Sequence, residues 1–243
     1  MNTGFVYVVT TVGRDYQQPN MRCVPTWFEG TIYFGPCKRA MRAKMGEGDY
    51  VFGISSCSSR PRRIVFAARI AKQMTFSEAY ERYPKLRGPL GPIHVRPTHL
   101  PIGAFPDSHY EHIPGANHED DWRNDLRSPE LDAFFTCETS GTCEGRWLGA
   151  GGPAVRGEIL DFLRTCSVHG NAGPLATSNA GATEDAPVRH GRLYTGLHLE
   201  TEDPAALLKL VCRTAVRASI QEPTRGLERT GSCEAGKARR RNC

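Results

Sequence analysis

The apolar residues in the first part of the chain fall in short continuous runs that are separated by turn residues. The runs are rich in β-branched and aromatic side chains, and each is too short for a helix of ordinary length. Such runs are typical of buried strands. They predict strands over residues 5–11, 31–34, 50–54 and 64–70.

A short helix is predicted between the second and third of these strands. Pro36 suits the first turn of a helix and Gly46 suits its end, while Cys37, Met41 and Met45 recur at every fourth position. The recurring apolar residues predict one buried side. The other positions hold basic residues that we expect to face solvent or a ligand: Lys38, Arg39, Arg42 and Lys44.

A second helix is predicted after the fourth strand. Thr75 and Glu78 have the spacing of a capping box, and Pro84 ends the helix at about Tyr83. The strands lie too close together in the sequence for crossover connections between parallel neighbours. We therefore expect the α+β class, with helices flanking a small curved or barrel-like mixed sheet.

The later part of the chain gives weaker patterns. Residues 85–128 are rich in proline and histidine and lack periodicity, so we expect a long loop-rich surface segment there. Ser128 and Pro129 favour a short helix, while residues 133–137 are equally consistent with a strand. The other predictions are helices over 153–166 and 204–220, the latter capped by Asp203, a mobile connection over 168–187, and a strand over 192–199.

Composition indicates one globular domain followed by a tail. Of the 243 residues, 39% are hydrophobic and 23% are charged, which is enough apolar surface for a core. We expect residues 1–220 to form a single domain and residues 221–243 to form a disordered basic tail. No apolar run approaches the roughly 20 residues of a membrane span, and no basic segment precedes the first apolar stretch. A cytoplasmic protein without membrane contact is expected.

The nine cysteines are an odd number, and they are scattered without regular spacing. Small secreted scaffolds carry dense cysteine patterns, so reduced thiols are expected here. Cys137 and Cys143 lack the spacing of a structural zinc site. The sequence predicts no metal and no cofactor.

Basic residues are concentrated at the start of the chain. Residues 1–100 hold 15 Lys and Arg against 6 Asp and Glu, residues 101–160 hold 4 against 11, and residues 161–243 hold 12 against 9. A basic segment favours a polyphosphate partner, because each neutralised phosphate releases counterions. The alternatives are a solvated basic surface and a surface that meets an acidic protein.

Four stretches in order carry a family resemblance: residues 7–10, the basic helix from Cys37, residues 48–53 and residues 63–70. Together they resemble the nucleotide modification associated domains, a prokaryotic and phage family found with DNA-modification systems. The Gly-Asp pair before a hydrophobic strand is also similar to the PUA, ASCH and EVE group of small barrels. The resemblance covers roughly residues 5–85 and implies a PUA-like fold, modified nucleotides or nucleic acid as ligands, and DNA-modification enzymes as candidate partners.

The resemblance implies recognition or handling of modified nucleotides or nucleic acid, and our first hypothesis is a non-catalytic binding module. An aromatic ring can stack on a base, while hydroxyls and arginines can bond its edges and the phosphates. The nucleic-acid-binding residues expected on this basis are Trp27, Arg39, Arg42, Ser55, Ser56, Arg60 and Arg62. The open alternatives are a core position for Trp27, a solvated face for the helix arginines, and a turn for the serines.

A dense group of histidines and acids offers a second function. Three imidazoles and four carboxylates occur within residues 109–122. Such groups bind metal ions or transfer protons near neutral pH. The alternative is therefore a metal-assisted enzyme acting on nucleotides or nucleic acid, with His112, His118 and Glu119 as its catalytic residues. The segment lacks the His-Glu-x-x-His spacing, so a structural loop is equally open.

Overall fold

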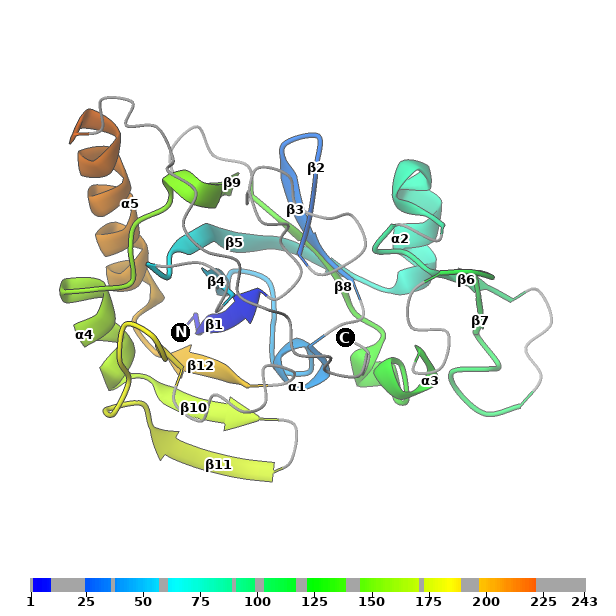
Figure 1. Ribbon diagram of the computed structural model, residues 1–243. Coiled ribbons are helices and arrows are strands. Elements are labelled where there is room, and N and C mark those ends of the chain that lie inside the picture. Colours follow the sequence, from blue (N-terminus) through cyan, green and yellow to red (C-terminus); the bar gives the residue numbers. More distant parts are fainter. Residues whose placement is uncertain are drawn as a thin grey trace, which may run out of the picture.

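The structure is a computed structural model of the chain. It describes residues 2–9, 25–35, 38–56, 61–88, 91–98, 103–116, 122–138, 145–170, 173–188 and 197–221. These residues form a large mixed sheet, helices against one of its faces, and a smaller lobe beside it (Figure 1).

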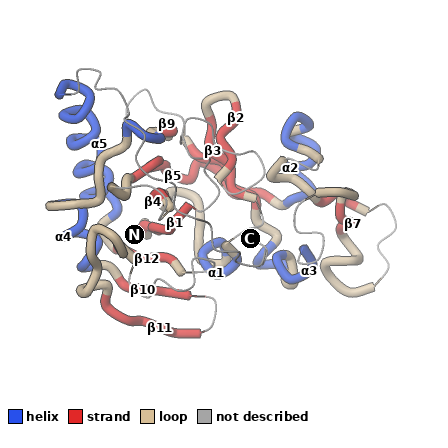
Figure 2. The backbone as a smooth tube through the Cα atoms, viewed as in Figure 1, coloured by secondary structure: helices blue, strands red, loops and turns tan. Residues whose placement is uncertain are grey.

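The sheet has ten strands. Along its width the order is β11-β10-β12-β1-β4-β5-β8-β3-β2, and β9 pairs with β5 beside this path. The strands are β1 (Gly4–Val9), β2 (Thr26–Phe28), β3 (Thr31–Phe34), β4 (Tyr50–Ser55), β5 (Ile64–Met74), β8 (Phe134–Cys137), β9 (Arg146–Trp147), β10 (Ser167–Gly170), β11 (Gly173–Ser178) and β12 (His198–Thr201). Figure 2 shows β1, β4 and β5 in the middle of the molecule, between α4 and α5 on one side and α2 and α3 on the other, with β10 and β11 at the lower edge.

The mixed α+β class is confirmed, but the sheet is not a closed barrel. Within the described residues β11 and β2 end the strand order without pairing to each other. β1 and β4 are parallel, so the expectation that no crossover occurs is wrong. The connection between them holds β2, β3 and the helix α1 (Arg39–Arg42).

The long strand β5 joins the two parts of the sheet. Its first residues pair with β4, and from Ile70 onward it pairs with β8, with a register shift between Ile70 and Lys72. Register irregularities of this kind bend a strand. The predicted strand over 64–70 is therefore confirmed, although it extends to Met74.

The two faces of the sheet bury different cores, because successive side chains of a strand point to opposite faces. On one face Val6, Val8 and Phe52 pack with apolar residues of α4 (Glu158–Thr165) and α5 (Pro204–Gln221). On the other face Phe5 and Tyr7 pack with a second set, which includes Ile32, Phe34, Met41, Met45 and Phe135. The predicted burial of Met41 and Met45 is confirmed, and Cys37 lies outside the described residues.

A third core fills the lobe formed largely by the segment that was expected to be a surface loop. Its elements are α2 (Phe76–Arg82), η1 (Pro84–Leu86), β6 (Val95–Pro97), β7 (Tyr110–His112), α3 (Trp122–Asp125) and η2 (Pro129–Leu131). Ile93, Val95, Tyr110 and Trp122 are buried in it. The described part of the segment is rich in loops, as expected, but it buries a core of its own, which was not expected because elements of three or four residues are too short to show a periodic pattern.

Other local predictions have mixed outcomes. The capping box of Thr75 and Glu78 is confirmed, and Asp203 accepts a hydrogen bond from the Ala206 amide at 3.0 Å. The prediction of a mobile connection over residues 168–187 is wrong, because β10 and β11 lie there.

The predicted helices are shorter than expected. The one expected between Pro36 and Gly46 is the single turn α1, and the one expected over 153–166 is α4, which begins only at Glu158. Both a 3-10 turn and a strand, β8, follow Ser128. The tail over 222–243 lies outside the described residues.

The cysteines of the described part differ in state. Cys137 and Cys166 are free and buried, and burial raises the pKa of both thiols. Cys212 is disulfide-bonded, so the expectation of reduced thiols is wrong for this residue. Cysteine spacing alone did not reveal this disulfide, because a disulfide joins residues that are neighbours in space.

Among the described helices, none combines the length and the apolar character that crossing a membrane requires.

Candidate functional site

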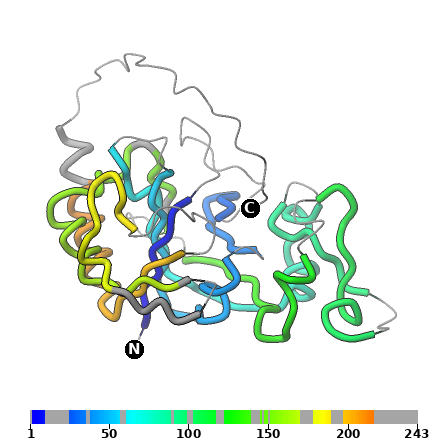
Figure 3. The backbone as a smooth tube through the Cα atoms, turned by 60° about the horizontal axis from the view of Figure 1, so that its bottom comes forward, coloured from blue at the N-terminus to red at the C-terminus, as the bar shows by residue number. Residues whose placement is uncertain are grey.

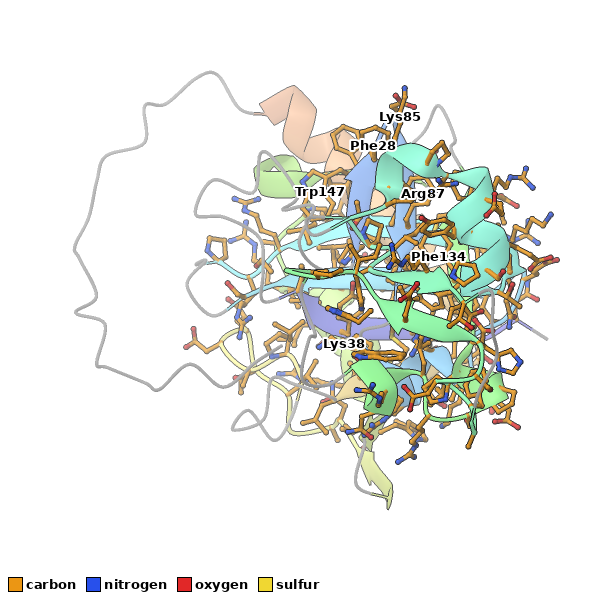
Figure 4. The ribbon with its side chains drawn as sticks, turned by 90° about the vertical axis from the view of Figure 1, so that its right-hand side faces the viewer. Phe28, Lys38, Lys85, Arg87, Phe134 and Trp147 are labelled. Carbon is orange, nitrogen blue, oxygen red and sulfur yellow. The ribbon has the colours of Figure 1, made fainter. Side chains whose placement is uncertain are left out.

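Cations lie on both sides of the single-turn helix α1. Lys38, just before it, has a φ of 62°, a left-handed conformation that is uncommon outside glycine, and its ammonium lies 5.4 Å from the centroid of the Tyr7 ring. Arg39 is half-buried and donates to the carbonyl oxygen of Asn124 at 3.1 Å. Lys44 follows the helix, and its side chain is 47% exposed. Figure 4 shows Lys38 well separated from the labelled Trp147.

The register of three strands brings titratable side chains to this helix. β1 pairs with β12 so that Tyr7 opposes His198 and Phe5 opposes Glu200. β12 in turn pairs with β10 so that His198 opposes His169. Opposed residues of neighbouring strands lie on the same face of a sheet. In Figure 3 the orange β12 lies beside the dark blue β1.

Lys44, His169, His198 and Glu200 form one hydrogen-bonded group, which we call the His–Glu–Lys cluster. The Lys44 ammonium lies 2.6 Å from Glu200 Oε1 and 3.3 Å from His169 Nδ1. His198 Nε2 lies 2.8 Å from Glu200 Oε1, and His169 Nε2 lies 3.4 Å from Glu200 Oε2. The two imidazole rings stack with their centroids 5.7 Å apart. One carboxylate therefore holds a cation and two imidazoles.

These contacts set the charges of the cluster. Burial raises the pKa of Glu200, but hydrogen bonds from His198 and Lys44 outweigh it and lower that pKa to about 2. Burial lowers the pKa of His169, and the attraction of Glu200 does not offset it. A neutral His169 with its proton on Nε2 fits both contacts, since Nδ1 then accepts from Lys44 while the protonated Nε2 faces Glu200 Oε2 at 3.4 Å. The cluster thus pairs the Lys44 ammonium directly with the Glu200 carboxylate.

The pKa of Glu200 predicts a loss of stability in acid. Because the folded protein lowers this pKa from 4.5 to about 2, the contribution is present above pH 4.5 and disappears as the pH falls toward 2. One pKa unit corresponds to about 1.4 kcal/mol, and partial exposure of Glu200 reduces the effect, so we expect about 2 kcal/mol. Urea unfolding of the wild type and Glu200→Gln across this pH range measures it. Parallel pH profiles for the two proteins would contradict the assignment.

Three of the predicted binding residues, Arg42, Ser55 and Arg62, are buried, and their hydrogen bonds stabilise the fold. The Arg42 guanidinium donates to the carbonyl oxygens of Asp125, Leu131 and Ala133. Arg62 donates to the carbonyl of Ser55 near the β4–β5 connection. The expectation that Arg42 lies on an exposed basic side is wrong, because the chain around η2 covers it.

The predicted binding residues do not lie in one place. Ser55 and Arg62 lie at the β4–β5 connection, whereas Arg39 and Arg42 lie on α1. Buried Ser55 accepts a hydrogen bond from the Arg63 amide at 2.9 Å, as a turn residue would. Ser56 is half-buried. Arg60 lies outside the described residues.

Trp27 occupies an intermediate position. Its half-buried ring packs against the core that contains Tyr7. Among the described residues its buried indole N–H has no hydrogen-bond partner. A stacking role for Trp27 stays a prediction.

The histidine and acid segment shows structural contacts where it is described. The His112 ring stacks on buried Trp122 with centroids 6.2 Å apart and lies 5.6 Å from the ring of His94. His118 and Glu119 lie outside the described residues. Across the residues that are described, no three His, Cys, Asp or Glu side chains are grouped so that they could hold a metal ion.

The sequence analysis missed the His–Glu–Lys cluster. Its members lie at positions 44, 169, 198 and 200, and only the sheet brings them together. One local signal was present: His198 and Glu200 flank Leu199 with the period of two that places polar side chains on one face of a strand.

Residues 1–88 match the family model described as nucleotide modification associated domain 2. The resemblance to the nucleotide modification associated domains is thereby confirmed for this segment, which runs from β1 through α2 and η1. No curated protein matches the chain. No solved structure matches it either.

Proposed function

We propose that the protein is a non-catalytic module that binds modified nucleotides or nucleic acid at the surface around α1 and β12. The observation that carries the proposal is the position of α1 within the matched segment, with the adjacent cations Lys38 and Arg39 both partly exposed. Amino and guanidinium groups contact phosphates, and each such contact adds salt-dependent affinity.

The proposal assigns the phosphates to the start of α1. Lys38 and Arg39 are adjacent and partly exposed, and the Arg39 guanidinium donates to the carbonyl oxygen of Asn124. The basic balance of the first hundred residues, 15 cations against 6 anions, supports the same partner. We further propose a PUA-like relationship, a cytoplasmic location and association with DNA-modification enzymes, on the strength of the family resemblance.

The double substitution Lys38→Ala and Arg39→Ala tests the proposal. Loss of two phosphate contacts should reduce the slope of log affinity against log salt by about 2 and weaken binding at low salt by about tenfold per contact. Fluorescence anisotropy with labelled DNA and RNA, each with and without modified bases, measures both quantities.

Arg213→Ala is the matched control. Arg213 is a partly exposed arginine on α5, which packs on the opposite face of the sheet, and it pairs with Glu158. It should leave the salt slope unchanged. Equal slopes for the wild type and the Lys38 and Arg39 variant would rule out the proposed surface.

A further inference from the structure

The Lys44 cation of the His–Glu–Lys cluster is already paired with a carboxylate, unlike the cations of a site built for phosphate. Lys44 and Glu200 carry opposite charges 2.6 Å apart, and His169 adds no charge at neutral pH. A phosphate that approached Lys44 would also approach the Glu200 carboxylate and be repelled by it. A neutral ligand with hydrogen-bonding groups suits this arrangement better.

The cluster keeps hydrogen-bonding capacity for such a ligand. An ammonium has three donors, and that of Lys44 contacts Glu200 and His169, with about half of the side chain exposed. Glu200 Oε1 accepts from Lys44 and His198, while Oε2 has the single longer contact with His169. A third N–H of Lys44 and a lone pair of Oε2 therefore form a donor beside an acceptor.

The surroundings hold this donor and acceptor in place. The His198 side chain is 2% exposed, and its ring lies 5.9 Å from the Phe5 ring and stacks on His169. His169, His198 and Glu200 all lie on paired strands of the sheet. A polar pair fixed by packing loses little conformational freedom when it binds a ligand.

We infer that Lys44 and Glu200 read the edge of a nucleobase, while Lys38 and Arg39 hold the phosphates. Base edges present an amino or imino donor next to a carbonyl or ring-nitrogen acceptor, which complements one carboxylate oxygen and one ammonium N–H. The inference rests on the proposed function and divides its surface into a charge-dependent part and a base-dependent part.

The test compares an oligonucleotide with an abasic oligonucleotide of the same length. The full-length wild type should bind the normal oligonucleotide about 5- to 150-fold more tightly, the range expected for one pair of base contacts. Glu200→Gln and Lys44→Gln should each bring this ratio toward one with an unchanged salt slope. Glu138→Gln, which removes a carboxylate paired with Arg69 elsewhere on the sheet, is the control and should preserve the ratio.

The outcomes separate the two claims. An unchanged ratio in both variants overturns the base-reading inference, even where the Lys38 and Arg39 variant supports phosphate binding. A fall of the salt slope by about 1 in Lys44→Gln also overturns it, because Lys44 then contacts phosphate. Failure of the wild type to bind either oligonucleotide overturns both claims. Thermal unfolding checks each variant, and half-exposed Lys44 gives the decisive substitution if Glu200→Gln does not fold.

Discussion

Replacement of Arg42 by alanine is expected to lower the free energy of unfolding by about 3–5 kcal/mol. The Arg42 side chain is 2% exposed, and its guanidinium bonds the carbonyls of Asp125, Leu131 and Ala133. Each buried carbonyl that loses its partner costs about 1–3 kcal/mol. The substitution also leaves a cavity beside Phe76, whose ring centroid lies 5.9 Å from the guanidinium. Urea unfolding followed by circular dichroism measures the change.

Two further variants sharpen this prediction. Arg42→Lys should recover less than half of the loss, because one ammonium does not reproduce the planar fork that reaches several carbonyls. Arg39→Ala, on the same turn of helix, should cost about 1 kcal/mol or less, since half-buried Arg39 makes one hydrogen bond to a carbonyl. Equal stability changes at positions 39 and 42 would show that the buried network does not anchor α1.

Gly53→Ala is expected to destabilise the protein by about 3 kcal/mol or more. A β-carbon at this position in β4 would lie 2.1 Å from a ring carbon of Phe66 and 2.8 Å from a methyl of Val9. Phe66 is fully buried against Tyr7, Phe34 and Trp147, so its ring has no space to move. Overpacking of a rigid core costs about 1–3 kcal/mol, and more where nothing can yield. The midpoint of thermal unfolding should fall by several degrees.

Gly151→Ala is the matched control for Gly53→Ala. Gly151 ends the short helix η3 (Gly149–Gly151), and no atom lies within 4 Å of the β-carbon it would gain. The change should alter the free energy of unfolding by about 0.5 kcal/mol or less. If Gly53→Ala proved as mild as this control, the close packing of β4 on β5 would be wrong.

Four strands of the matched segment could be predicted because each contains one continuous apolar run, whereas the three-residue strand β2 was not predicted. Tyr50 to Ile54 and Ile64 to Ile70 are buried at nearly every position, so no period had to be recognised. The capping box was equally local, since Thr75 and Glu78 lie three positions apart and satisfy each other. Patterns that depend on neighbours in the sequence were thus sufficient for these elements.

The candidate site could not be predicted in the same way. The spacing of Met41 and Met45 correctly gave the buried side of α1, but it assigned Arg42 to an exposed side. The burial of Arg42 depends on the chain around Leu131, almost ninety positions away. Likewise the partners of Lys44 are 125 and 156 positions away. Long-range pairing of polar groups leaves no periodic mark in the sequence.

The position of β1 in the sheet affects how the protein can be made. Among the described strands β1 precedes all the others in the chain, and β12, which covers one of its edges, follows all the others. A nascent chain therefore carries an apolar strand with one unpaired edge until β12 has been synthesised. Unpaired edges of this kind recruit other chains. Translation products that stop short of β12 are accordingly expected to depend on chaperones and to aggregate when these are absent.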